Sequence, residues 1–200
     1  MNRAALVLFL SAFPAAPARA SNEDFGFNAR AIGMAEAVSA DSEDLASLSL
    51  NPASLGHLRK ATLDAGLSRL FHAQPGPLDL SGMNAAVGVP ITHPSYPGAL
   101  AVRWSYDVIE PGVAIERLVG FSYATRSWRE IGPGAFDVGM TLKALSRTGS
   151  LGASSAKKAA VDLGTRYRWG DGRAVGLAIL NINNPDTTTG PLRDRAPAML

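Results

Sequence analysis

The chain of 200 residues contains no cysteine and comparatively few charged residues. The lack of thiols excludes a thiolate zinc site, a disulfide framework, a cysteine nucleophile and lipid attachment at an N-terminal cysteine. Charged residues make up 18% of the chain, whereas about a quarter is usual in globular proteins. Together with 20 glycines and 13 prolines, this composition excludes a coiled coil, a collagen-like chain and a nucleic-acid-binding arm.

Long apolar runs are also lacking. No stretch holds 18 consecutive apolar residues, so no transmembrane helix is predicted. The apolar run from Ala4 to Phe13 follows Arg3 and precedes the small-x-small pattern Ala18-Arg19-Ala20, as in a cleaved signal peptide. We therefore predict a signal peptide over residues 1–20 and an exported protein. An N-terminal anchor helix, the alternative, would need about twice that apolar length.

The chain has little excess charge of either sign. It carries 19 Lys and Arg against 17 Asp and Glu. Loss of Arg3 and Arg19 with the signal peptide leaves the two signs equal, so the pI near 9.1 is a property of the precursor. The mature protein therefore has no basic field for nucleic acid or anionic lipid, and we exclude nucleic acid as a partner.

From residue 60 onward, apolar and polar residues alternate with period two, the pattern of β-strands. In residues 159–169, for example, Val161 and Leu163 alternate with Asp162 and Gly164. Seven such segments follow one another, at residues 61–67, 83–89, 100–108, 119–126, 136–144, 159–169 and 173–183. Turn formers separate them, and the shortest reversal is Gly170-Asp171-Gly172. The sequence therefore predicts an antiparallel meander.

The two faces of this predicted sheet differ in a way that suggests a membrane. One face carries ionised groups in mid-strand, and we assign six of them to a wet lumen: Asp64, Arg103, Asp137, Lys143, Asp162 and Arg166. The other face is apolar, with aromatic residues near strand ends: Trp104, Tyr106, Tyr123, Tyr167 and Trp169. An apolar exterior, an aromatic girdle and a polar interior are typical of an outer-membrane barrel. The alternative is a secreted or periplasmic β-sandwich binding module.

The predicted fold class is thus all-β, an antiparallel up-and-down outer-membrane β-barrel. A single-chain bacterial barrel has an even number of strands, whereas seven are predicted here. We therefore expect residues 59–200 to be the first half of a larger, truncated barrel. The tight hairpin at Gly170-Asp171-Gly172 is expected on the periplasmic side, and residues 71–80, 111–114 and 147–156 outside, because barrels have short periplasmic turns.

Residues 21–58 precede the first strand and do not alternate. The stretch from Ala31 to Leu50 is rich in Ala and Leu. Asp41 or Ser42 would cap a short helix there, with Asp44 in its first turn, and Pro52 would end it. We predict a short helical plug that fills the barrel. A solvated leader is the alternative.

Motifs in this segment carry a family resemblance. Phe25 is followed by an Ala-Arg-Ala-x-Gly-Met core, an acidic Ala-rich stretch and an Asn-Pro-Ala-x-Leu motif. The motif residues are Arg30, Gly33, Met34, Asn51, Pro52, Ala53 and Leu55. This opening resembles the PorV/PorQ-type outer-membrane proteins of the FadL-like barrel superfamily, and the hairpin of the last two strands is also similar. The chain departs from that family in Glu36, where glycine is usual, and in lacking the second half of a barrel.

The resemblance implies a barrel of about 14 strands with an N-terminal hatch on the periplasmic side. It also implies two different functions. One is passive uptake of a hydrophobic small molecule, and the other is a non-transporting role in protein secretion or surface attachment, with a secreted protein as cargo. An apolar lumen would favour uptake, and a charged lumen would favour docking. Outer-membrane lipid is the expected partner in either case.

Searches for catalytic or metal chemistry find nothing specific. His57, His72 and His93 are interpreted as loop histidines, because none forms an i,i+4 pair. Residues 149–158 do not match a phosphate loop, and no nucleophile elbow is present. Asp64, Asp137 and Asp162 would form a catalytic pair only by meeting across the lumen, and nearby cations favour a ladder of solvated charges. We predict a non-enzymatic protein without metal or cofactor.

A difference between the faces is also expected in their tolerance of charge. A Lys at Met140 or Leu163 should destabilise the protein by about 2–4 kcal/mol. The same change at Thr141 or Gly164, on the polar face, should cost less.

Overall fold

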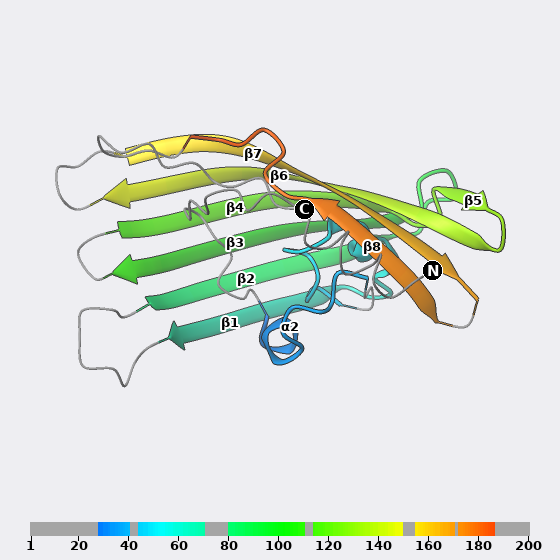
Figure 1. Cartoon of the computed structure of the whole chain (residues 1–200), viewed down its shortest axis with the longest axis horizontal. Coiled ribbons are helices and arrows are strands. Elements are labelled where there is room, and N and C mark those ends of the chain that lie inside the picture. The colour runs from blue at the N-terminus through cyan, green and yellow to red at the C-terminus, as the bar shows by residue number, and fades with distance from the viewer. Residues whose placement is uncertain are drawn as a thin grey trace, which may run out of the picture.

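The computed structural model describes residues 28–40, 44–70, 80–110, 114–149, 155–170 and 172–186. The predicted signal peptide, His72 and the predicted helix cap at Asp41 or Ser42 lie outside these residues. In the described residues, one antiparallel sheet carries a short, largely non-helical segment on one face (Figure 1). We call residues 28–40 and 44–58 the N-terminal segment. No helix in the described part of the chain is both long and apolar enough to cross a membrane.

The strands follow the predicted meander. Their bounds are β1 Thr62–Leu70, β2 Leu80–Ile91, β3 Gly98–Glu110, β4 Ala114–Thr125, β5 Arg129–Ile131, β6 Gly134–Gly149, β7 Ser155–Trp169 and β8 Arg173–Ile179. The order across the sheet is β1-β2-β3-β4-β6-β7-β8, and β5 pairs only with β6. All seven predicted strands are therefore present, and most are longer than the alternation indicated.

Three details of the strand prediction are wrong. The short strand β5 was not predicted, and it forms a hairpin with β6 in which Ile131 pairs with Gly134. Strands β6 and β7 extend into the predicted loop at residues 147–156. The last strand ends at Ile179 and not at residue 183, because Asn181 and Asn184 have positive φ angles of 52° and 43°, which interrupt extended backbone.

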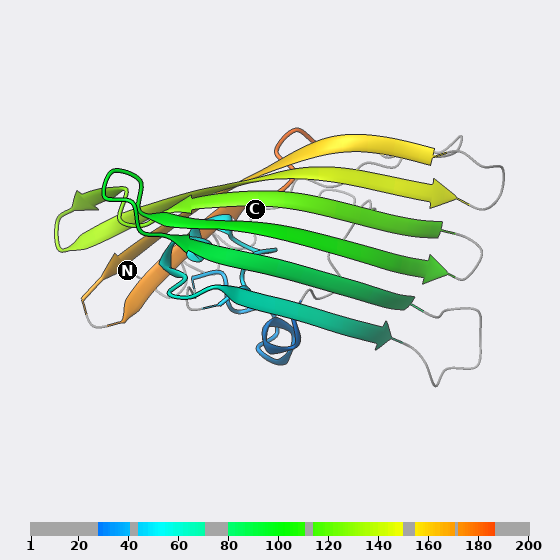
Figure 2. The same cartoon turned by 180° about the vertical axis from the view of Figure 1, so that it is seen from behind.

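The described sheet is curled, and β8 runs at a marked angle to β1 (Figure 1). The N-terminal segment lies in front of the strands in Figure 1 and behind them in Figure 2, so it occupies the concave face. Within the described residues, β1 and β8 are the two edges of the sheet. The predicted all-β antiparallel architecture is confirmed.

The N-terminal segment contains two short helical elements. The first, α2 (Ala29–Gly33), begins after Asn28, whose side chain accepts hydrogen bonds from the backbone N–H groups of Arg30 and Ala31. The second, η1 (Pro52–His57), is a 3₁₀ helix with Asn51 as its N-cap. The prediction that Pro52 ends a helix is wrong. Pro52 begins one, because the fixed φ angle of proline suits the first helical position.

The sheet buries its polar face and exposes its apolar face. On the concave face, Asp137 is 0% and Asp162 3% exposed. On the convex face, Leu67 is 83% and Phe121 58% exposed. Other exposed apolar residues of that face are Leu63, Met83, Val87, Val89, Leu100, Val102, Trp104, Met140, Leu142, Leu163, Val175 and Leu177. This distribution is the reverse of the usual one in water-soluble sheets.

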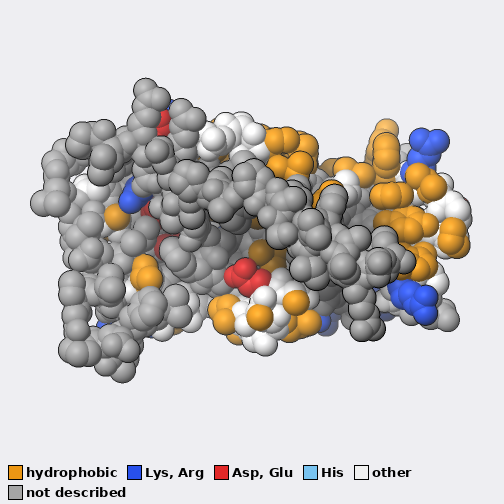
Figure 3. Space-filling model, viewed as in Figure 1, with side chains coloured by type: hydrophobic (Ala, Val, Ile, Leu, Met, Phe, Trp, Pro, Cys, Tyr) orange, Lys and Arg blue, Asp and Glu red, His pale blue; other side chains and the backbone are white. Residues whose placement is uncertain are grey.

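Aromatic residues lie at two levels of the convex face. Trp104, at the middle of β3, stacks on Tyr106, which lies nearer the Glu110 end of that strand, with ring centroids 6.4 Å apart. At the other end of the sheet, Tyr167 lies 4.8 Å from Phe136 and 5.5 Å from Trp169. In Figure 3, apolar side chains with Lys or Arg beside them gather at that second end, on the right.

The distance between the two aromatic groups follows from the register. Trp104 is level with Val119 and therefore with Ala144 on β6. Ala144 is eight residues from Phe136, which corresponds to about 27 Å along the strand. A tilt of about 40° reduces this to about 21 Å, close to the apolar band of about 25 Å on outer-membrane barrels.

Candidate functional site

Two adjacent rows of small residues cross the concave face. Strand pairing gives one row as Thr62, Gly88, Ala101, Ser122, Thr141 and Asp162, and the next as Pro90, Ala99, Ala124, Gly139, Gly164 and Ala178. Small side chains and glycines allow another backbone to approach a strand closely. The N-terminal segment lies on these rows, and η1 contacts β3, β4, β6 and β7.

Asn51 is the residue that connects the N-terminal segment most extensively. It is 0% exposed. Its Oδ1 accepts the N–H of Ala53 at 3.0 Å, and its Nδ2 donates to the carbonyl oxygens of Ser39 at 2.9 Å and Thr165 at 3.0 Å. One amide side chain thus caps η1, holds the preceding turn and binds β7. Removing it would leave buried backbone groups without partners, which is costly.

Three glycines provide the space for the Asn51-Pro52-Ala53 motif. A Cβ at Gly139 would overlap the backbone of Pro52 and Ala53, and one at Gly164 would overlap the Asn51 side chain. A Cβ at Gly176 would meet the carbonyl oxygen of Ser39 at 2.5 Å. The expectation that Gly164 tolerates a lysine better than the apolar face is therefore wrong, since this position is packed and not open to water.

Apolar packing fixes the other part of the segment. Leu45, Leu48, Leu55 and Leu58 form a buried cluster with Ala86, Ala99, Ala101 and Ala124 of the sheet. Each fully buried leucine contributes about 1.5–3 kcal/mol. A Cβ at Gly88 would lie 2.7 Å from Leu45 and 2.8 Å from Leu58. The segment is thus packed against the sheet, unlike a solvated leader.

Asp137 on β6 connects η1 to the charged groups of β7. Its carboxylate lies 3.0 Å from His57 Nε2, accepts the Ser127 N–H at 2.7 Å and binds Arg168 Nε at 3.1 Å. The Arg166 guanidinium lies 3.8 Å away. The interpretation of His57 as a loop histidine is therefore wrong, because it ends η1 and contacts a buried carboxylate.

The His57–Asp137 pair does not form a catalytic triad in the described structure. Among the described residues, His57 contacts no serine or threonine hydroxyl. A triad requires such a nucleophile on the other ring nitrogen.

Arg126 completes the attachment of η1 by donating to the carbonyl oxygens of Gly56 at 3.1 Å and Leu58 at 3.0 Å. These groups position η1 on the sheet.

Asp162 on β7 has two partners. Its Oδ1 lies 2.7 Å from Lys143 Nζ and accepts the N–H of Asn181 at 2.8 Å. The side chain of Asn183 then bonds to the backbone N–H of Val161 at 3.1 Å and to the carbonyl oxygen of Ala159 at 2.8 Å. After β8, the side chains of Asp162 and Asn183 form hydrogen bonds with backbone groups that a continued strand would use for pairing, which explains where β8 ends.

The predicted lumen residues all lie on the concave face. Besides Asp137, Lys143, Asp162 and Arg166, Asp64 accepts a hydrogen bond from Asn28 Nδ2, and Arg103 is 5% exposed. The described contacts pair cations with carboxylates. A further pair, Glu116 and Arg147, was not predicted and has an Nε–Oε1 distance of 3.5 Å.

The predicted plug motif divides into two parts. Asn51, Pro52, Ala53 and Leu55 are buried against the sheet. Arg30 instead pairs with Asp44 at 2.8 Å on the exposed side of the segment. Gly33 has no atom near its Cβ position, and Met34 is 43% exposed.

Residues that sequence reasoning missed lie around the same contacts. They are Ser39, His57, Arg126, Gly139, Gly164, Arg168 and Gly176. Gly139 on β6 and Gly164 on β7 alternate with charged residues, which is a detectable signal for a closely packed backbone.

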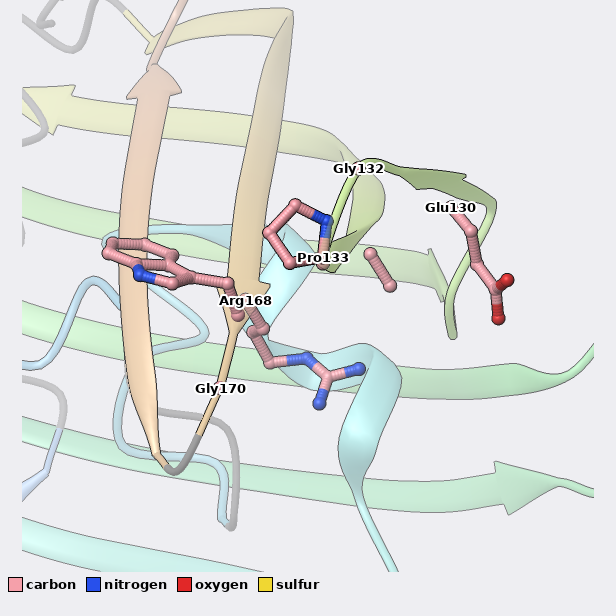
Figure 4. Close-up of a pocket in the computed structure, with 8 residues that line it drawn as sticks. Glu130, Gly132, Pro133, Arg168 and Gly170 are labelled. Carbon is pink, nitrogen blue, oxygen red and sulfur yellow. The ribbon is translucent and has the colours of Figure 1, made fainter.

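A cleft of about 390 Å³ lies at the end of the sheet where the β5–β6 and β7–β8 hairpins meet. Figure 4 shows Arg168, Glu130 and the hairpin residues Gly132, Pro133 and Gly170 around it. Arg168 already binds Asp137 and Ser127. The cleft is therefore beside the Asp137 contacts, and four of its eight lining residues are glycine or proline.

Metal ligands are not grouped in the part of the chain that the structure describes, where no set of three His, Asp or Glu residues is placed to hold an ion. His93 lies in a turn, as predicted, and stacks on Tyr96.

Comparison of the chain with family models, curated proteins and solved structures finds no match.

Proposed function

We propose that this chain is an exported outer-membrane protein whose sheet is the wall of a β-barrel, with the N-terminal segment as a hatch inside it. The observation that carries the proposal is the inverted burial of the sheet. A convex face with Leu67 at 83% exposure and a concave face with Asp137 at 0% suit hydrocarbon outside and a polar lumen inside. The distance between the two aromatic groups along the barrel axis, about 21 Å for a tilt of about 40°, is also close to the thickness of the apolar band of outer-membrane barrels.

The secreted β-sandwich explains these features less well. A sandwich packs its apolar face against a second sheet, whereas the N-terminal segment packs on the polar face here. Leaving a large apolar side chain in water forfeits about 1.5–3 kcal/mol, and more than ten such residues of the convex face are exposed. Lipid removes this cost.

Within the membrane, we propose a non-enzymatic docking role in protein secretion or surface attachment. The concave face carries paired charges, such as Lys143 with Asp162 and Arg168 with Asp137. A hydrophobic ligand passing through the lumen would have to cross these charges, and in the described chain the apolar cluster beside them is limited to Leu118, Leu145 and Ala160. The tight attachment of Asn51 also favours a hatch that stays closed. The resemblance of the opening motifs to PorV/PorQ-type proteins supports the same role.

Membrane fractionation tests the location. The chain, expressed in a Gram-negative host with its own leader and extended to the about 14 strands that the resemblance implies, should lose residues 1–20 and sediment with outer membranes after a carbonate wash. A soluble periplasmic protein would contradict the barrel and favour the sandwich.

Conductance and ligand binding test the role. The purified protein in planar bilayers should be electrically silent, while Asn51→Ala should conduct intermittently, because the hatch loses its bond to Thr165. Asn183→Ala, at the sheet edge, should remain silent and is the matched control. Steady conductance of the unmodified protein, or saturable binding of a fatty acid, would favour uptake over docking.

A further inference from the structure

The convex face has a groove near the ends of β1, β2 and β3, outside the site described above. Its volume is about 300 Å³, and its lining includes Leu67, Arg69, Met83, Tyr106 and Val108. Leu67, Met83 and Tyr106 are level with one another across the three strands. The groove thus has an apolar floor on the face that we assign to lipid.

Basic residues lie beside this groove. Arg117 pairs with Tyr106 across the strands, and its guanidinium lies over the Tyr106 ring at 5.4 Å. Such stacking orients the planar group and leaves its N–H donors available at the ring edge. Lys157 is at the same level, two strands further along, and is exposed. Arg69 borders the groove itself.

The described carboxylates of this region point to the other face. Glu116, the neighbour of Arg117, is 3% exposed and pairs with Arg147. Asp107, the neighbour of Tyr106, lies beside the Cβ positions of Gly82 on the concave side. The convex face at this level therefore presents positive charge next to an apolar groove. The Tyr106 and Trp104 rings place that level at the membrane interface.

We propose that this groove binds an anionic, phosphate-bearing acylated lipid, with the apolar part next to its headgroup against Leu67 and Met83 and the phosphate on Arg117. This inference rests on the proposed membrane location. Arg117 and Lys157 complement a net negative headgroup, whereas a zwitterionic lipid brings its own cation to the same level. Guanidinium groups also bind phosphate oxygens in a bidentate manner. The tight hairpin between β7 and β8 lies at the opposite end, which we assign to the periplasm, so the lipid belongs to the outer leaflet.

Native mass spectrometry of the full chain in non-ionic detergent tests the proposal. The probes are diphosphoryl lipid A, phosphatidylglycerol and phosphatidylcholine with matched acyl chains. The two anionic lipids should be retained at least fivefold better than phosphatidylcholine. Arg117→Gln should reduce that retention about fivefold, the effect of one basic residue near an anionic lipid. Arg173→Gln, an exposed arginine at the opposite end, should have no effect.

A second variant tests the contribution of the groove to lipid binding separately from the contribution of the charge. Met83→Trp fills the groove without changing charge, so it should lower retention of all acylated probes. Equal retention of the three lipids, or an unchanged profile in Arg117→Gln, would overturn the proposal. Full competition by inorganic phosphate would also overturn it, because a free-anion site would then be sufficient. Failure of the unmodified protein to fractionate with membranes would instead contradict the proposed function.

Discussion

The convex and concave faces of the sheet are built from the same strands but interact with different surroundings. On β7, Leu163 is 40% exposed, while its neighbour Asp162 is 3% exposed and binds Lys143. In water, such a sheet would lose hydrophobic stabilisation on one face and incur desolvation costs on the other. The comparison shows that stability is provided differently on each face.

The concave face depends on specific fit. Its buried carboxylates Asp137 and Asp162 have cationic partners, and several of its glycines match the backbone of the N-terminal segment, so most changes there remove a particular contact. The convex face depends only on being apolar, because side chains such as Leu163 and Phe121 have no packed protein layer above them in the described chain. Shape should therefore matter on one face and polarity on the other.

The largest effect is expected from Gly164→Val, which tests the role of fit. Any Cβ at this position overlaps Asn51, so the N-terminal segment should be displaced at a cost of at least about 3 kcal/mol. Limited proteolysis should then cleave the segment. Gly120→Ala is the control on the same face, because its Cβ would make ordinary contacts at 3.4 Å or more. Equal protection of both variants would show that close fit is unimportant.

A smaller effect is expected from Leu163→Lys, which tests the role of polarity. A lysine near the middle of the apolar band should lower the free energy of unfolding by about 2–4 kcal/mol in bilayers. Ser146→Lys, level with Arg117 near the interface, should cost only about 0–1 kcal/mol. Urea titration of vesicle-inserted protein measures both. A water-soluble fold would give no such dependence on depth.

The smallest effect is expected from Arg30→Gln. The Arg30–Asp44 pair is exposed, with side-chain exposures of 44% and 36%, and surface ion pairs contribute about 0–1 kcal/mol. The same urea titration should therefore show a shift below about 1 kcal/mol. A larger shift would show that Arg30 stabilises the segment beyond its contact with Asp44.

The strands were predictable because their signal is local. Alternation in residues 159–169 requires only that one face is apolar, and the strand β7 follows it. The end of β8 was not predictable from alternation. It depends on Asp162 accepting the N–H of Asn181 from a different part of the chain. The role of Pro52 was misjudged although its signal is local, since Asn51 as N-cap followed by proline at the first helical position is a helix start that a sequence can show.

The sequence by itself determined the antiparallel sheet, the division into an apolar and a charged face, and the importance of Asn51-Pro52-Ala53. The first two properties follow from residue period and composition, and the third from the resemblance of the motif to PorV/PorQ-type proteins; none depends on how distant parts of the chain meet. Only the tertiary structure decided that Gly139, Gly164 and Gly176 accommodate this motif, and that His57 binds Asp137. Such contacts require the register of four strands to bring residues 80 positions apart within hydrogen-bond distance, and no local pattern encodes that register.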